Sequence, residues 1–237
     1  MKAIGYMSSG HGRQNSQDRL LIYDTILAKG RFEAEWKGEQ RGCLAIFDGV
    51  GGIAGGEYAS GYAAMQMWNY PIQNGEQMLN SYIQGIGTTL RNRNGCATTA
   101  SGLLMLRDRC MLFHVGNTRI WTYDGEYLEQ ITQDQTYIEE SGHQLSKEKI
   151  EQYGNVITGC LGGNDPSLTD RLCINDVTDV VSKCTALLFT CDGIHDYVDN
   201  YDIEKVLQSG SDLSDIVDIA RKNGSDDDCS ILCIKRK

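Results

Sequence analysis

Short apolar runs separated by polar turns recur along the chain and predict β-strands. Several runs are apolar throughout, which indicates burial. The predicted strands cover 4–7, 20–23, 44–47, 97–106, 110–115, 119–123, 127–131, 171–174, 186–190 and 229–234. Because turn residues join the closely spaced runs between 97 and 123, we expect an antiparallel meander there.

Helical spacing appears between the strand clusters. Residues 57–68 fit a helix whose large side chains share one face, namely Tyr58, Tyr62, Met65 and Trp68. Further helices are predicted over 76–91, over 133–140, after Ser146, and over 213–222. Thr132 is the expected N-cap of the helix over 133–140, because Gln135 follows at the spacing of a capping box.

The order of these elements favours an α+β fold. Strands come in clusters, helices come in pairs, and many strand connections are short, which argues against a doubly wound parallel sheet. The chain has 237 residues and two prolines, and no Pro-rich linker divides it. We therefore expect a single domain over 1–237.

Composition narrows the classes of partner. A net charge of -10 disfavours nucleic acid and anionic membrane surfaces. No signal peptide is evident, and the apolar runs are short of the roughly 20 residues that a membrane span needs. Nine cysteines without a CxxC pair are typical of small buried hydrophobes in a reducing compartment, so a cytoplasmic location is expected.

Carboxylates stand at the ends of three apolar runs. Asp48-Gly49 ends the run at 43–47, Asp192-Gly193 ends the run at 186–191, and Asp226 to Asp228 precede the run at 229–234. Alone, each pair is more often a turn, and the triplet is more often an exposed acidic loop. If the three ends meet, they form an oxygen-rich site for hard divalent cations.

Other chemistry fits less well. None of the histidines His11, His114, His143 and His195 belongs to a zinc pattern. The glycines between 49 and 56 do not fit a dinucleotide-binding loop, because the surrounding pattern is not βαβ.

Several segments in order resemble one family. They are Arg13 to Asp18, FDGVGG at 47–52, Gly95 to Thr99, HVGNTR at 114–119, Thr132 to Thr136, Asn155 to Gly162, TCDG at 190–193 and GSDDDCS at 224–230. This series resembles the metal-dependent Ser/Thr protein phosphatases of type 2C, the PPM family, in their compact bacterial form. The resemblance covers nearly the whole chain and implies two packed antiparallel β-sheets flanked by helices.

The resemblance also implies a mechanism and a set of site residues. Two Mn²⁺ or Mg²⁺ ions would neutralise the phosphate charge and activate a bridging water for in-line attack. The implied metal ligands are Asp48 as the bridge, the Gly49 carbonyl, Asp192 and Asp227. Gln17 and Asp18 would orient waters in the outer shell, and Arg13 would hold the substrate phosphate. No organic cofactor is expected. A phosphoprotein substrate and a cognate Ser/Thr kinase are the implied partners of a monomeric enzyme.

The sequence departs from the family at three informative positions. Val50 stands where animal members carry a His, so water or substrate would supply the leaving-group proton. Asn117 replaces an Asp that helps hold a third metal, so two ions are expected and a third is doubtful. Asp228 replaces the usual Asn. Two alternatives stay open: a pseudophosphatase that acts as a binding module, and a hydrolase of small phosphate esters. The segment 141–155 aligns with the family's flap beside the cleft.

Overall fold

Two six-stranded antiparallel sheets form the centre of the protein. The computed structural model describes residues 1–35, 42–50, 55–72, 76–141, 146–154 and 156–235. In the first sheet the strand order is β10 (Leu128–Gln130), β9 (Arg119–Tyr123), β13 (Ala186–Thr190), β14 (Cys229–Lys235), β1 (Lys2–Ser8) and β4 (Gly30–Glu35). In the second it is β12 (Cys173–Asp176), β8 (Cys110–Val115), β7 (Ala100–Met105), β5 (Gly42–Phe47), β2 (Arg19–Ile22) and β3 (Thr25–Leu27).

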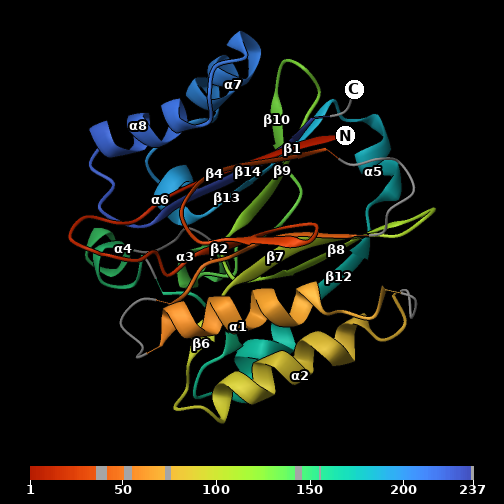
Figure 1. Ribbon diagram of the computed structural model, residues 1–237. Coiled ribbons are helices and arrows are strands. Elements are labelled where there is room, and N and C mark those ends of the chain that lie inside the picture. The colour runs from red at the N-terminus through yellow and green to blue at the C-terminus, as the bar shows by residue number, and fades with distance from the viewer. Residues whose placement is uncertain (36–41, 51–54, 73–75, 142–145, 155, 236–237) are drawn as a thin grey trace.

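Helices cover the outer face of each sheet (Figure 1). Helices α1 (Gly56–Trp68) and α2 (Leu79–Arg91) pack on the second sheet, and α7 (Asn200–Ser209) and α8 (Ser214–Lys222) cover the first. Shorter helices are α3 (Tyr137–Glu140), α4 (Lys147–Tyr153), α5 (Thr178–Lys183) and α6 (Asp192–His195), and β6 (Ala97–Thr98) pairs with β11 (Leu161–Gly162). The expected α+β sandwich of antiparallel sheets and flanking helices is confirmed.

Helix α1 turns its small side chains, and not most of its large ones, toward the sheet. Its buried residues are small apart from one methionine: Gly56, Ala59, Ser60, Ala63, Ala64 and Met67. Tyr58, Met65 and Trp68 are instead exposed by 37%, 44% and 50%. Small side chains let the helix axis approach the sheet closely, and that contact takes precedence over burying the larger side chains. The predicted helix is confirmed, but large side chains do not mark its buried face.

The predicted meander is wrong at its third strand. Strands β7 and β8 pair as expected, with Leu103 opposite Leu112, but β9 pairs with β10 and β13 in the other sheet. The chain crosses between the sheets at Gly116, whose φ of 108° is a left-handed conformation that favours glycine. A Cβ there would also lie 2.6 Å from the Cβ of Thr99. This crossing places Asn117 between the two sheets.

The helix predicted over 133–140 begins later than expected. Thr136, rather than Thr132, is its N-cap and accepts a hydrogen bond from the Glu139 amide. Thr132 instead accepts from the Ile120 amide, and the buried Gln135 side chain accepts from the Gly116 amide. The predicted capping box is therefore wrong, because the Thr132 and Gln135 side chains accept hydrogen bonds from the backbone near the start of β9. Ser146 caps α4 as predicted.

Other predicted elements match within a few residues, and some were missed. The pattern did not single out β3, β4, α5, α6 or α7, and the run predicted at 171–174 begins at Cys173, after a 3-10 helix at Pro166–Arg171.

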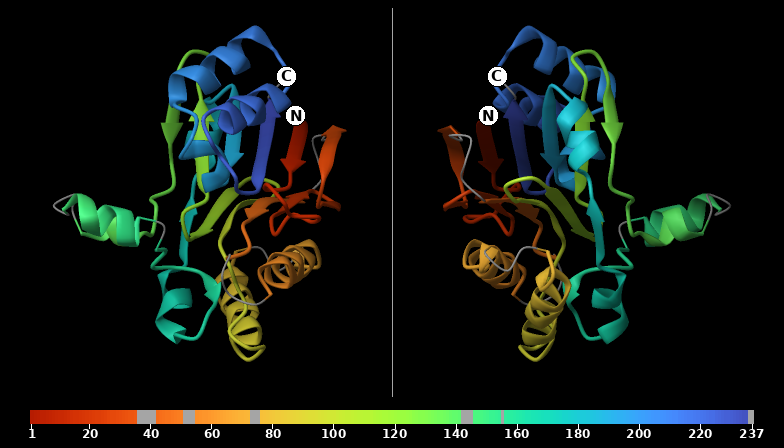
Figure 2. Two further views of the ribbon diagram at one scale, coloured as in Figure 1. Left: turned by 90° about the vertical axis from the view of Figure 1, so that its left-hand side faces the viewer. Right: turned by 90° about the vertical axis from the view of Figure 1, so that its right-hand side faces the viewer.

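All nine cysteines are free, and only Cys173 is exposed, as expected for small buried hydrophobes. The flap segment 141–155 lies partly outside the described residues. Within it, α4 projects from the side of the body (Figure 2).

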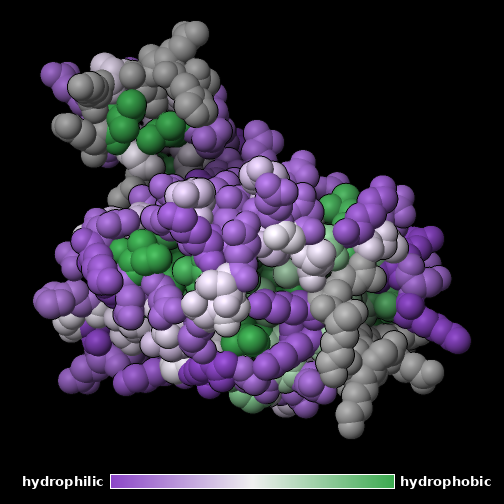
Figure 3. All heavy atoms as spheres, turned by 90° about the horizontal axis from the view of Figure 1, so that it is seen from above, coloured by the Kyte–Doolittle hydropathy of each residue, from purple (hydrophilic) through white to green (hydrophobic). Residues whose placement is uncertain are grey.

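The surface has few apolar groups on the face seen in Figure 3. That face is mostly hydrophilic, and hydrophobic side chains appear as scattered groups, which is ordinary for a protein surface. The chain ends lie side by side, because β1 pairs with β14 and Lys2 stands opposite Lys235 (Figure 1). Among the described helices, none is long and apolar enough to cross a membrane.

Truncating the core of the first sheet tests this packing. Phe189 in β13 is fully buried, so Phe189→Ala should lower the free energy of unfolding by about 3–5 kcal/mol in a urea titration. Tyr127, 61% exposed, is the matched control, and Tyr127→Ala should change the free energy by less than about 0.5 kcal/mol. Equal effects of the two changes would contradict this description of the core.

Candidate active site

A cavity of about 310 Å³ opens where the two sheets meet. Strands β13 and β14 are antiparallel neighbours, so the end of β13 and the start of β14 lie at one edge. The end of β5 from the other sheet faces the same space. The cavity is lined by Gln17, Asp48, Gly49, Val50, Thr99, Asn117, Ile157, Asp192, Gly193, Asp196, Tyr197 and Asp227. The three strand-end carboxylates singled out from the sequence therefore line one cavity.

Asp48 is held in place by the residues after β6. Its backbone N–H donates to Thr99 Oγ1 at 3.1 Å, and its carbonyl accepts from the Thr99 amide at 2.8 Å. The Gly49 amide donates to the Gln17 carbonyl at 3.2 Å. A Cβ at Gly49 would lie 2.4 Å from the Gly56 carbonyl oxygen, so only glycine permits this close approach. With the backbone held in this way, the Asp48 side chain lines the cavity.

Asp192 stands at the first position of α6, directly beyond β13. Its Oδ2 accepts a hydrogen bond of 3.1 Å from Asn117 Nδ2. The chain crosses between the sheets at Gly116, and this crossing brings Asn117 into contact with Asp192 at the end of β13. Asp196, one helical turn after Asp192, lines the same cavity. Sequence analysis missed it, although its four-residue spacing from Asp192 was a usable signal.

Asp18 lies behind the cavity and is 1% exposed. Its Oδ2 accepts a hydrogen bond of 2.6 Å from Ser230 Oγ, while its buried Oδ1 has no hydrogen-bond partner among the described residues. A buried carboxylate oxygen without a donor is costly unless a cation or its waters supply the missing interaction. This arrangement fits the outer-shell position predicted for Asp18.

The neighbouring residues Asp227 and Asp228 lie in different surroundings: Asp227 lines the cavity and Asp228 is buried. Asp227 is half exposed at the cavity, and its Oδ1 lies 3.0 Å from Arg13 Nη1. Asp228 points away from the cavity into the protein and is 3% exposed. Arg13 contacts Asp227 but does not itself line the cavity.

Arg221 on α8 holds the two loops that carry these residues. Its Nη1 donates to the carbonyls of Ser225 and Asp227, each at 2.7 Å, and its Nη2 donates to the Ser9 carbonyl at 3.0 Å. Arg221 could not be singled out from the sequence, because its partners are backbone carbonyls from distant segments.

Burial raises the pKa values of the site carboxylates, and charges of neighbouring carboxylates add to the shifts. Burial raises the pKa of Asp18 to about 7, and the charges of Asp228 and Asp192 add to the shift. Burial, followed by the charges of Asp18 and Asp192, holds the pKa of Asp48 well above its usual range. The pKa of Asp192 is raised by burial and by Asp227. A divalent cation would relieve this repulsion, and the oxygen donors suit Mg²⁺ or Mn²⁺.

The present side-chain arrangement does not by itself form a closed ligand set. Among the described residues, no three His, Cys, Asp or Glu side chains are grouped so that they hold one ion. One Asp227 oxygen, Oδ1, is occupied by its contact with Arg13. The oxygen donors and the unpartnered Asp18 oxygen fit a hard divalent cation.

No histidine is among the described residues that line the cavity. His195 follows Asp192 on α6, but its Nδ1 lies 2.9 Å from Thr190 Oγ1 and its side chain is 2% exposed. His114 in β8 contacts Ser101 Oγ at 2.8 Å. Neither side chain lines the cavity, and both fill polar positions within the layers.

The chain is similar in sequence and in fold to several bacterial protein phosphatases. The chain is 23% identical over 219 residues to the serine/threonine phosphatase stp of Listeria monocytogenes serotype 4b, covering 81% of this chain and 84% of that protein. It is 23% identical over 246 residues to the protein phosphatase PhpP of Streptococcus pneumoniae serotype 2, covering 95% and 93%. The solved structure of serine/threonine phosphatase Stp1 from Staphylococcus aureus superposes with a TM-score of 0.77 at 21% identity, covering 99% and 94%. No family model matches the chain.

The raised pKa of Asp18 predicts a pH dependence of stability in the presence of chelator. The folded protein keeps this proton up to about pH 7, whereas the unfolded chain loses it near pH 4. Stability contributed by Asp18 therefore falls as pH rises from about 4 to about 7. Relative to the wild type, Asp18→Asn should gain stability between pH 5 and pH 8 in thermal or urea unfolding.

Asp170→Asn is the matched control for that experiment, because Asp170 is exposed. Its stability difference from the wild type should stay constant across the same pH range. A constant difference for Asp18→Asn as well would contradict the assigned pKa shift.

Proposed function

We propose that this chain, which is related in sequence and fold to the PPM-type Ser/Thr protein phosphatases, hydrolyses phosphoserine and phosphothreonine in proteins. The observation that carries this proposal is the meeting of Asp48, Asp192 and Asp227 in one cavity with Arg13 beside them. Relatives that carry the name Ser/Thr phosphatase over most of the chain support the same activity.

The proposed metal ligands are Asp48 as the bridge between two ions, the Gly49 carbonyl, and Asp192 with Asp227. When bound, two Mn²⁺ or Mg²⁺ ions would neutralise phosphate charge and lower the pKa of a coordinated water. Asp18 and Gln17 would orient waters around the ions. Asn117 is neutral and already donates to Asp192, so the proposal includes two ions and leaves a third out.

The residues of the chain have distinct tasks in the reaction. Arg13 binds phosphate oxygens through its planar guanidinium and orients the ester toward the carboxylate cluster. Thr99 and Tyr197 carry the hydroxyl groups among the described cavity residues, and Thr99 Oγ1 accepts a hydrogen bond from the Asp48 amide. Burial, followed by the charge of Asp196, raises the pKa of the Tyr197 phenol, so this hydroxyl keeps its proton and is a poor nucleophile. Both observations favour direct attack by water.

Physiological partners follow from this activity. A phosphoprotein is the proposed substrate, and a cognate Ser/Thr kinase would supply it. We further propose a monomeric enzyme in the cytoplasm, where such kinases and their substrates meet. The chain's net charge of -10 makes nucleic acid and anionic membranes poor partners.

Hydrolysis of an aryl phosphate and of a phosphothreonine peptide tests the proposal. Both should depend on Mn²⁺, stop on chelation, and fall at least about a hundredfold in Asp192→Ala, because the variant loses a metal ligand. Asp218→Ala, an exposed change on α8, should keep wild-type rates.

The alternatives give different results in the same assay. A binding module would show no hydrolysis with Mn²⁺ bound, and this result would contradict the proposed activity. A hydrolase of small phosphate esters would cleave the aryl phosphate and leave the phosphopeptide intact.

A further inference from the structure

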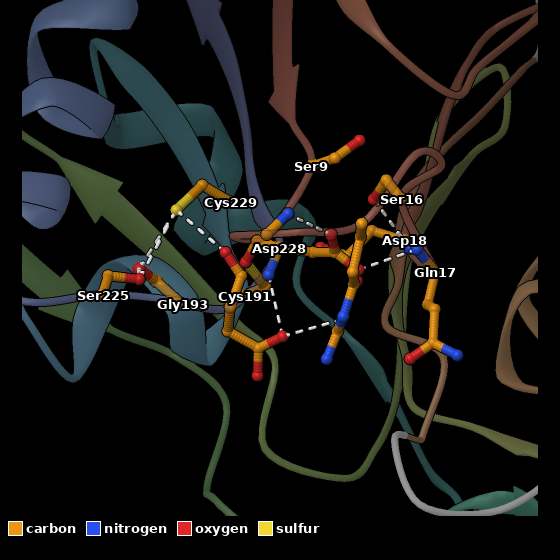
Figure 4. Close-up of polar contacts among 12 residues, drawn as sticks. Ser9, Ser16, Gln17, Asp18, Cys191, Gly193, Ser225, Asp228 and Cys229 are labelled. Atoms are coloured by element: carbon orange, nitrogen blue, oxygen red, sulfur yellow. Dashed lines mark hydrogen bonds and ion pairs between the residues drawn. The ribbon is translucent and has the colours of Figure 1, made fainter.

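Asp228 is a buried carboxylate that collects hydrogen bonds from a distant loop. Its Oδ1 accepts from the Gly10 amide at 2.7 Å, and its Oδ2 accepts from the Gln17 amide at 2.7 Å and from Arg13 Nη1 at 2.8 Å. Figure 4 shows Asp228 among the residues of this loop. Three donors on one side chain that is 3% exposed satisfy the buried charge.

The loop that Asp228 holds is the connection between β1 and β2, residues 9–18. It packs tightly on the start of β14: a Cβ at Gly10 would lie 2.7 Å from the Asp226 carbonyl oxygen. The His11 amide donates to that same carbonyl at 2.9 Å. Asp228 binds the loop near both ends, at Gly10 and at Gln17, and it contacts Arg13 between them.

Asp227 and Asp228 both contact the same nitrogen of the Arg13 guanidinium. Both carboxylate contacts, to Asp227 and to Asp228, use Nη1. Among the described residues, Nε and Nη2 of Arg13 have no hydrogen-bond partner, and the side chain is 37% exposed. These two nitrogens form the edge that binds two phosphate oxygens at once.

The carboxylate is needed for this arrangement, since an amide cannot reproduce it. Asn offers one acceptor oxygen, and its NH₂ group would face the N–H donors that Oδ1 or Oδ2 now accept. The Arg13 contact would lose its charge, and one backbone N–H would lose its acceptor. Arg13 would then keep only Asp227, which is itself a proposed metal ligand.

We propose that Asp228 is a positioning residue for phosphate recognition: it anchors Arg13 through Nη1 and presents the Nε–Nη2 edge to the phosphate group. The inference rests on the proposed function for the role of Arg13. An opposing effect is the negative charge of Asp228, which by itself would weaken binding of a phosphate dianion. The geometry indicates that orientation of Arg13 outweighs this repulsion.

A double-mutant cycle with Arg13 tests the proposal. Inorganic phosphate is the probe, measured as an inhibitor of aryl phosphate hydrolysis and by calorimetry on the Mn²⁺-loaded protein. Asp228→Asn should weaken phosphate binding and raise KM about tenfold, the loss of one charge-assisted hydrogen bond, while changing kcat less. In an Arg13→Ala background, the same change should have almost no further effect on phosphate binding.

Asp226→Asn is the matched control. Asp226 lies two residues before Asp228, its side chain is exposed, and the change removes the same charge. It should leave phosphate affinity unchanged. Unchanged or tighter phosphate binding in Asp228→Asn would overturn the proposal, as would an equal loss with and without Arg13, since that result indicates a structural role only. Calorimetric phosphate binding needs no turnover, so it separates failure of this inference from failure of the proposed phosphatase activity.

Discussion

Burial of several carboxylates at one edge of the sandwich is the constraint on which the site depends. Burial is the main cause of the raised pKa values of Asp18, Asp48 and Asp192, and charges of neighbouring carboxylates add to each shift. A fold stable enough to tolerate such a cluster needs a large core, which the two sheets and their helices supply. A divalent cation at this edge would stabilise the ionised carboxylates.

Strand pairing and hydrogen bonds to the backbone keep these groups together. Antiparallel pairing of β13 and β14 brings Asp192 and Asp227 to one edge. Hydrogen bonds from Thr99 fix Asp48, and Arg221 and Asp228 tie the loops of Arg13 and Asp227 to each other. The functional side chains are therefore supported by residues whose own partners are mostly backbone groups.

Much of the fold was predictable because buried strands leave a continuous apolar signal. The runs at 44–47, 186–190 and 229–234 are strands in the structure, and the carboxylates beyond them share one cavity. The crossing at Gly116 was not predictable from spacing, since a short turn looks the same whether the next strand joins the same sheet or the opposite one. The buried face of α1 was missed because its close approach to the sheet favours alanine over tyrosine and tryptophan. Arg221 had no sequence signal, and the distinct orientations of Asp227 and Asp228 follow only from the loop's path.

The central claim is that the carboxylate cluster binds two divalent ions. Crystals grown with Mn²⁺ and measured at the manganese absorption edge test it most directly. The account predicts two anomalous peaks roughly 3.5–4 Å apart, between Asp48, Asp192 and Asp227, with Asp48 between the peaks. A cavity without anomalous signal at saturating Mn²⁺, or ions bound only elsewhere, would contradict it.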